Sequence, residues 1–166
     1  MNYFYLNTST FKSFLKTQMV AAKPVQSLMS LTNIPNLRDD TFLPDPTKYG
    51  SIVRGLQYLS LTCPDIKFSV NKLSQFMHHP TSTHWFCVKR LLRYLAGTIT
   101  HGLLLHKKSP INLHAYLDAD LVGNPDEKSS ISAHIVFLGH NPMSWSSKKQ
   151  KFIVYFSIKV EYCVMA

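Results

Sequence analysis

Hydrophobic residues recur every three or four positions through the first part of the chain, which is the spacing of amphipathic helices. This pattern predicts helices at residues 8–22, 48–61, 64–77 and 81–96. Pro24 ends the first helix, because the residue before a proline avoids the helical conformation. Thr81 or Ser82 is expected to cap the last helix, and Gly97 to end it in a left-handed conformation. The proline-containing residues 25–47 predict an irregular connector.

Beyond the last of these helices the hydrophobic period changes to two, which indicates β-strands. Strands are expected at residues 103–106, 112–120, 132–138, 142–147 and 152–156. Residues 139–141, Gly-His-Asn, predict a tight turn between two of them. A final helix is expected to begin near Ser157. Helices followed by a meander of strands indicate an α+β protein that divides near residues 100–110.

The net charge of +9 is concentrated in the middle of the chain. Nine basic residues lie there against a single acid, Asp65: Lys48, Arg54, Lys67, Lys72, Lys89, Arg90, Arg93, Lys107 and Lys108. Such a block favours a phosphate backbone as partner, since bound cations release counterions. The charge alone is equally consistent with a solvated basic face that has no partner.

The composition excludes some classes of protein. A hydrophobic content of 45% is too high for a disordered tail, and no apolar run approaches the roughly 20 residues of a membrane span. The first residues lack the basic region of a secretory signal. Their interpretation as an organelle-import segment is left as an alternative. Cys63, Cys87 and Cys163 lack metal-ligand spacing and are expected to be reduced thiols. We therefore expect an intracellular protein of the nucleus or cytoplasm, with the mitochondrion as an open alternative.

Two acids suggest chemistry. Asp118 lies at the end of the alternating run 112–120, and Glu161 lies on the helix expected after the strands. A carboxylate on a first strand and a glutamate on the following helix make up half of a two-metal nuclease site, which would hold Mg²⁺.

Basic residues supply a second group of candidates. Lys89, Arg90 and Arg93 cluster on the helix at 81–96 and are predicted to contact a nucleic-acid backbone. Lys148 and Lys149 form a second short basic run and join these candidates. For the neighbouring Trp85, packing in the core is the favoured interpretation over stacking on a base.

Three colinear segments resemble the pol polyprotein of copia-type retrotransposons, especially those of plants. They are FKSFLKTQMVAAKPVQSLMS, KYGSIVRGLQYLSLTCPDIKFSVNKLSQFMHHPTSTHWFCVKRLLRYLAGTITHGLLL and NLHAYLDADLVGN with the following SAHIVFLGHNPMSWSSKKQ. The resemblance implies that residues 1–47 are the end of a reverse transcriptase region with its connector. It makes residues 48–106 a basic helical connection segment. Residues 107–166 would be a truncated ribonuclease H-like domain, an antiparallel β-meander with its first helix.

The resemblance also implies an activity. The family cleaves the RNA strand of RNA–DNA hybrids with two Mg²⁺ ions held by acids. On this chain Asp118 matches the first-strand metal ligand and Glu161 the first-helix ligand, both of them catalytic in the family. Asp120 belongs to the same motif and is expected to be an accessory residue more than a metal ligand.

Several positions depart from the family. Leu121-Val122 replace tryptophan and alanine, Cys63 and Arg54 replace an arginine and a glycine, and Lys159 puts a cation two residues from Glu161. The third and fourth acids of the family belong to elements that follow those found here. Two carboxylates should hold two Mg²⁺ ions poorly, because the repulsion between the ions is under-compensated.

Three hypotheses follow from these observations. The first is a degenerate pol segment without catalysis of its own, and the second is a ribonuclease H that becomes active when missing segments complete it. The third is a module that retains binding to an RNA–DNA hybrid or another nucleic acid. No membrane or small-molecule partner is expected.

Overall fold

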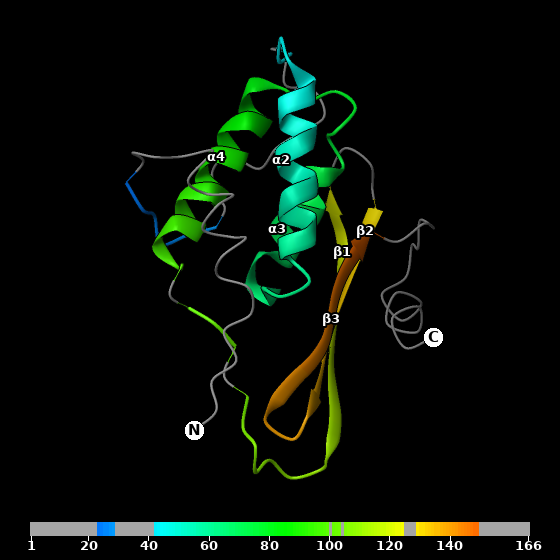
Figure 1. The fold of residues 1–166 in the computed structure, drawn as a ribbon. Helices are drawn as coiled ribbons and strands as arrows, with labels where there is room; N and C mark the ends of the chain where they lie inside the picture. The colour runs from blue at the N-terminus through cyan, green and yellow to red at the C-terminus, as the bar shows by residue number, and fades with distance from the viewer. Residues whose placement is uncertain (1–22, 29–41, 100, 104, 125–128, 150–166) are drawn as a thin grey trace. The chain divides into compact units, whose positions relative to one another are not determined.

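The computed structural model describes residues 23–28, 42–99, 101–103, 105–124 and 129–149. The chain separates after Leu103 into two compact units, which are described here one at a time. The described residues of the first, the helical unit, form α-helices, and those of the second, the sheet unit, form a three-stranded antiparallel sheet (Figure 1). The α+β class predicted from the hydrophobic periods is confirmed.

Helix α2 spans Pro46–Leu59 and begins two residues before the predicted start. The Asp45 carboxylate caps it by accepting a 3.0 Å hydrogen bond from the Thr47 amide, and Pro46 occupies the first turn, where its missing N–H costs nothing. One stripe of the helix is buried, made of Tyr49, Ile52, Val53 and Leu56. This stripe is the apolar face of an amphipathic helix.

The helix predicted at 64–77 is shorter and divided. It opens as a 3₁₀ turn, η1 (Pro64–Ile66), and continues as α3 (Lys67–Ser74). The expectation that the helix runs to residue 77 is wrong, because the amides of residues 75–77 bond to carbonyls three residues back rather than four. These tighter bonds satisfy the last carbonyls of α3 and end the helix early.

Helix α4 spans Ser82–Gly97, and Thr81 caps it as predicted. The Thr81 hydroxyl accepts from the His84 amide, and the His84 ring nitrogen Nδ1 accepts from the Thr81 amide at 3.0 Å. The prediction of a left-handed Gly97 is wrong: Gly97 is the last helical residue, and Gly139 is the glycine with positive φ among the described residues. A side chain at Gly97 would approach Pro24, so the glycine permits close contact with residues 23–28.

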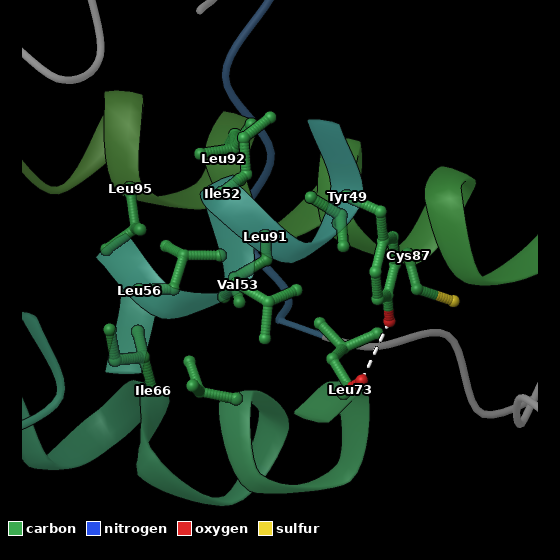
Figure 2. Close-up of a cluster of buried hydrophobic side chains, with 12 residues drawn as sticks. Tyr49, Ile52, Val53, Leu56, Ile66, Leu73, Cys87, Leu91, Leu92 and Leu95 are labelled. Atoms are coloured by element: carbon green, nitrogen blue, oxygen red, sulfur yellow. Dashed lines mark hydrogen bonds between the residues drawn. The ribbon is translucent and has the colours of Figure 1, made fainter. Parts of the chain in front are cut away.

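Helices α2, α3 and α4 enclose one hydrophobic core (Figure 2). Its members are Tyr49, Ile52, Val53, Leu56, Ile66, Val70, Leu73, Cys87, Val88, Leu91, Leu92 and Leu95. Partly buried side chains pack around them, including Trp85 and Tyr94. The three helices therefore hold the outward-facing residues of α2 and α4 in fixed positions.

The strand predicted at residues 103–106 is absent from the described part of this region. Instead of pairing with a strand, the backbone of residue 106 forms hydrogen bonds with the side-chain amide of Asn141. Its Oδ1 accepts from the His106 amide at 2.7 Å, and its Nδ2 donates to the His106 carbonyl at 3.0 Å. With both backbone groups satisfied by one side chain, residue 106 has no need of a strand partner.

The sheet contains β1 (Leu113–Asn124), β2 (Ser129–Leu138) and β3 (Asn141–Lys149), in the order β1-β2-β3. β1 begins one residue after its predicted start and ends four residues beyond its predicted end. β2 begins three residues before its predicted start, and β3 extends beyond its predicted bounds at both ends. The predicted turn at residues 139–141 is confirmed: Leu138 pairs with Asn141, and Gly139 between them has φ of 59°. Leu113 of β1 is 75% exposed.

Other predictions fall outside the described residues, namely the helix at 8–22, the strand at 152–156 and the helix from Ser157. The division of the chain at residues 47 and 106 stays a prediction. Within the described residues, no helix has the length and apolar content needed to cross a membrane.

Candidate nucleic-acid interface and acidic position

The acidic candidates begin with Asp118 on β1. Its Cα pairs with that of Ala133 on β2, and its side chain is exposed. The Cα pairing with β2 is regular from Leu113 to Asp120 and shifts only beyond Asp120. Glu161 lies outside the described residues.

The described part of the chain contains no group of three or more His, Cys, Asp or Glu residues that could hold a metal ion. Asp118 alone does not fit the pair of Mg²⁺ ions that the resemblance implies, since each hard cation takes about six oxygen ligands. The roles of Asp118, Asp120 and Glu161 as metal ligands therefore stay predictions.

The basic pair on β3 is divided by the strand. Lys148 pairs with Ser132 and is exposed, whereas Lys149 pairs with Ile131 and is half-buried. Successive residues of a strand point to opposite faces, so the two lysines lie on different sides of the sheet. They cannot act together on one phosphate from one face.

The predicted cluster on α4 is also divided, because its two arginines are engaged within the helical unit. The Arg90 guanidinium donates to the Ser27 hydroxyl, and Arg93 Nε donates to the Lys23 carbonyl at 2.7 Å. Both bonds fasten residues 23–28 along α4. The first hydrogen-bond partners of both arginines therefore belong to the protein.

Lys89 is different, since its side chain is exposed and its ammonium lies 5.6 Å from the centre of the Trp85 ring. A second ammonium, that of Lys48 on the first turn of α2, lies 5.7 Å from the same ring. Both distances are those of cation–π interactions. Lys48, Trp85 and Lys89 together are called the lysine–tryptophan cluster below.

Sequence reasoning did not single out Lys48 as a site residue, because its partners lie almost forty positions away and only the packing of α2 on α4 brings them together. The sequence favoured Trp85 as a core residue. In the structure the Trp85 ring packs against the core and also lies beside both ammonium groups.

Asp65, the one acid within the basic block, also has a hydrogen-bond partner within the protein. Its carboxylate accepts a 2.9 Å hydrogen bond from the hydroxyl of Tyr94. Burial, and then this hydrogen bond, raises the pKa of the Tyr94 phenol above its usual value. Tyr94 is thus tied to Asp65 rather than aligned with the basic residues of α4.

A pocket of about 220 Å³ lies beside this pair, at the ends of α2 and α4. Cys63, Asp65 and His101 are the titratable side chains that line it. Burial raises the pKa of the Cys63 thiol, which disfavours the thiolate that a nucleophilic site requires. The pocket therefore offers no activated nucleophile.

Comparison with known proteins identifies relatives. The chain is 50% identical over 153 residues to the Retrovirus-related Pol polyprotein from transposon RE2 of Arabidopsis thaliana, covering 92% of this chain and 10% of that protein. It is 52% identical over 147 residues to the corresponding polyprotein from transposon RE1 of the same plant, covering 89% and 10%. With the polyprotein from transposon TNT 1-94 of Nicotiana tabacum the identity is 36% over 115 residues, covering 69% and 9%.

The chain thus spans about a tenth of the length of these three polyproteins. No protein-family model matches it. No solved structure matches it either. Identity of about one half along nearly the whole chain shows common descent, and the chain belongs to the family of copia-type plant retrotransposon Pol polyproteins.

Proposed function

We propose that this chain is a nucleic-acid-binding segment of a retrotransposon Pol polyprotein and that the 166-residue polypeptide does not itself cleave RNA. The lysine–tryptophan cluster is the observation that carries the binding proposal. Two ammonium groups lie within 6 Å of one ring centre, contributed by two different helices.

Electrostatics favours an anion at this place. Each of the two ammonium groups carries a positive charge that attracts an anion. The interactions that Lys48 and Lys89 make within the described residues are with the ring rather than with a carboxylate. The phosphates of a nucleic-acid backbone supply that negative charge and can accept hydrogen bonds from each ammonium group.

The surroundings reinforce the same preference. Lys48 lies in the first turn of α2, whose amino-terminal end is capped by the Asp45 carboxylate. Arg90 and Arg93 add their charge along α4 even though their hydrogen bonds are internal. We therefore expect contact with the phosphate backbone, and affinity that falls steeply with salt.

Cleavage with two Mg²⁺ ions requires more carboxylates than the described residues bring together around Asp118. Asp118 is exposed, and no described His, Cys, Asp or Glu residues join it in a group of three or more. In the sequence, Lys159 stands two positions from Glu161, the other expected Mg²⁺ ligand. These features support weak binding of Mg²⁺ and the absence of cutting by this polypeptide.

Binding is tested with the purified chain and a fluorescent RNA–DNA hybrid, by anisotropy between about 50 and 200 mM salt. The double variant Lys48→Gln/Lys89→Gln should lower the slope of log affinity against log salt by about 1 for each lysine. The matched control is Lys107→Gln/Lys108→Gln, which removes the same charge from exposed residues of the sheet unit. Equal losses in the two double variants would show attraction by net charge alone and reject the cluster as the binding site.

Cleavage is tested on the same hybrid with added Mg²⁺, and the wild-type polypeptide is expected to leave the RNA strand intact. Cutting that disappears in Asp118→Asn would instead establish an active ribonuclease H and overturn the second half of the proposal.

A further inference from the structure

One aromatic residue beside the lysine–tryptophan cluster lies outside the core. Phe86 on α4 is 53% exposed, whereas its neighbours Cys87 and Val88 are at most 5% exposed. The buried face of α4 is complete without Phe86. The Phe86 ring is therefore accessible to a partner at the surface of α4.

The position of Phe86 on the helix places it among cations. Residues three and four positions apart are neighbours on a helix surface, so Phe86 adjoins Lys89 and Arg90. The Arg90 guanidinium donates to Ser27, so its first partner lies in residues 23–28. Lys89 extends toward Trp85, and the exposed ring of Phe86 follows Trp85 directly in the chain.

We propose that Phe86 is a stacking platform for an unpaired base, whose neighbouring phosphates are bound by Lys89 and Lys48. The inference rests on the proposed function and specifies its partner: single-stranded nucleic acid. An exposed aromatic ring next to ammonium groups is the combination by which proteins hold single strands, because every base has a stacking face and every nucleotide a phosphate.

The same geometry disfavours a duplex. In a paired helix both faces of each base are covered by its neighbours, so a ring on a protein surface reaches only the backbone and the groove edges. A single strand can turn a base out onto Phe86 without breaking pairs. We therefore expect the chain to prefer an unpaired template or overhang to a continuous hybrid of the same length.

The probe is a single strand of about 12 thymidine nucleotides, compared with a strand of equal length whose central nucleotides are abasic. Both carry the same phosphates, and they differ only in the bases that can stack. The thymidine strand should bind the wild-type chain more tightly. Phe86→Ala should weaken that binding by about 5- to 100-fold and leave binding of the abasic strand unchanged.

Two further variants sharpen the test. Phe68→Ala removes another half-exposed phenylalanine, 47% exposed on α3, and should leave the affinity for both strands unchanged. Phe86→Tyr keeps an aromatic ring and should bind the thymidine strand within a few-fold of the wild type. Since Phe86 is exposed, these variants should keep the far-UV circular dichroism of the wild type.

The outcomes separate the two proposals. If Lys48→Gln/Lys89→Gln weakens binding while Phe86→Ala does not, charge binding holds and base stacking is rejected. If Phe86→Ala weakens the thymidine and abasic strands equally, Phe86 acts on the protein and not on a base, which also rejects stacking. If no strand shows binding that depends on Lys48 and Lys89, the proposed function itself fails.

Discussion

The hydroxyl of Tyr49 donates a 2.8 Å hydrogen bond to the carbonyl oxygen of Leu73 and thereby joins α2 to α3 inside the core (Figure 2). Tyr49 is fully buried, so its hydroxyl would be costly without a partner. The bond orients α2 and therefore Lys48, the residue before Tyr49, whose ammonium lies over Trp85. The Tyr49–Leu73 hydrogen bond and the position of Lys48 over Trp85 thus both depend on the first turn of α2.

Replacing Tyr49 by phenylalanine should lower the free energy of unfolding of the helical unit by about 1 kcal/mol. The loss stays moderate because the Leu73 carbonyl keeps a second donor, the Phe76 amide at 3.2 Å. Urea denaturation followed by far-UV circular dichroism measures the change. An unchanged midpoint would show that the hydrogen bond contributes nothing net.

The pKa of Tyr49 predicts how stability depends on alkaline pH. Burial, followed by the nearby Cys87, raises the pKa of the phenol well above its ordinary value of 10.0. The unfolded chain ionises at the ordinary value while the folded chain stays neutral. The stabilisation is therefore fully present below pH 10.0 and is lost as the pH rises toward the folded pKa.

The unfolding midpoint of the wild type should thus fall above that pH, with a slope from Tyr49 of up to about 1.4 kcal/mol per pH unit. Tyr49→Phe has no phenol to ionise, so the difference between the variant and the wild type should narrow as pH rises. A difference that stays constant between neutral pH and about pH 11 would contradict the assignment.

Core packing predicts a contrast between two leucines. Leu91 on α4 is fully buried in the core, and Leu91→Ala should destabilise the helical unit by about 2–5 kcal/mol through lost burial and the cavity left behind. Leu61, which is 61% exposed, serves as the control, and Leu61→Ala should change stability by less than about 0.5 kcal/mol. Denaturant unfolding of both variants checks this, and similar losses would mean that the core is misassigned.

Two glycines should respond differently to substitution by alanine, one in the turn between β2 and β3 and one in helix α2. Gly139 has φ of 59°, and a Cβ there would overlap the Ser109 hydroxyl and the Pro110 carbonyl oxygen. Gly139→Ala should destabilise the hairpin by more than about 1 kcal/mol and speed hydrogen exchange at Leu138 and Asn141. Gly50→Ala, in helical conformation with Met77 at 4.0 Å, should be neutral or stabilising by up to about 1 kcal/mol. Slow exchange retained in Gly139→Ala would show that the turn relaxes without cost.

Local patterns located α2, α3 and α4, although α3 ends before its predicted bound. The spacing of Tyr49, Ile52, Val53 and Leu56 follows the helical period, and all four are buried in α2. Thr81 was one of two candidate caps, Thr81 and Ser82, because a hydroxyl before an apolar stripe satisfies the first free amides, and the structure has Thr81 in that place. These signals succeed because a helix makes its backbone bonds within its own segment.

Local patterns failed where distant residues decide the backbone. The strand expected at 103–106 is replaced by an irregular segment because the Asn141 side chain binds both backbone groups of His106. Gly97 is the last residue of α4 rather than a left-handed cap, and Pro24 lies close to it. Neither partner could be recognised from the neighbouring sequence.

The candidate site divides in the same way. The sequence by itself determined the family, the concentration of positive charge and the place of Lys89 on a helix, because these depend on residue identity and periodicity. Only the tertiary structure decided which cations bond to other parts of the protein and which stay exposed at the surface. It turned Arg90 and Arg93 toward residues 23–28 and brought Lys48 to Trp85. The reason is that a side chain takes its partner from whatever packing places within a few ångströms, and packing joins residues that the sequence keeps far apart.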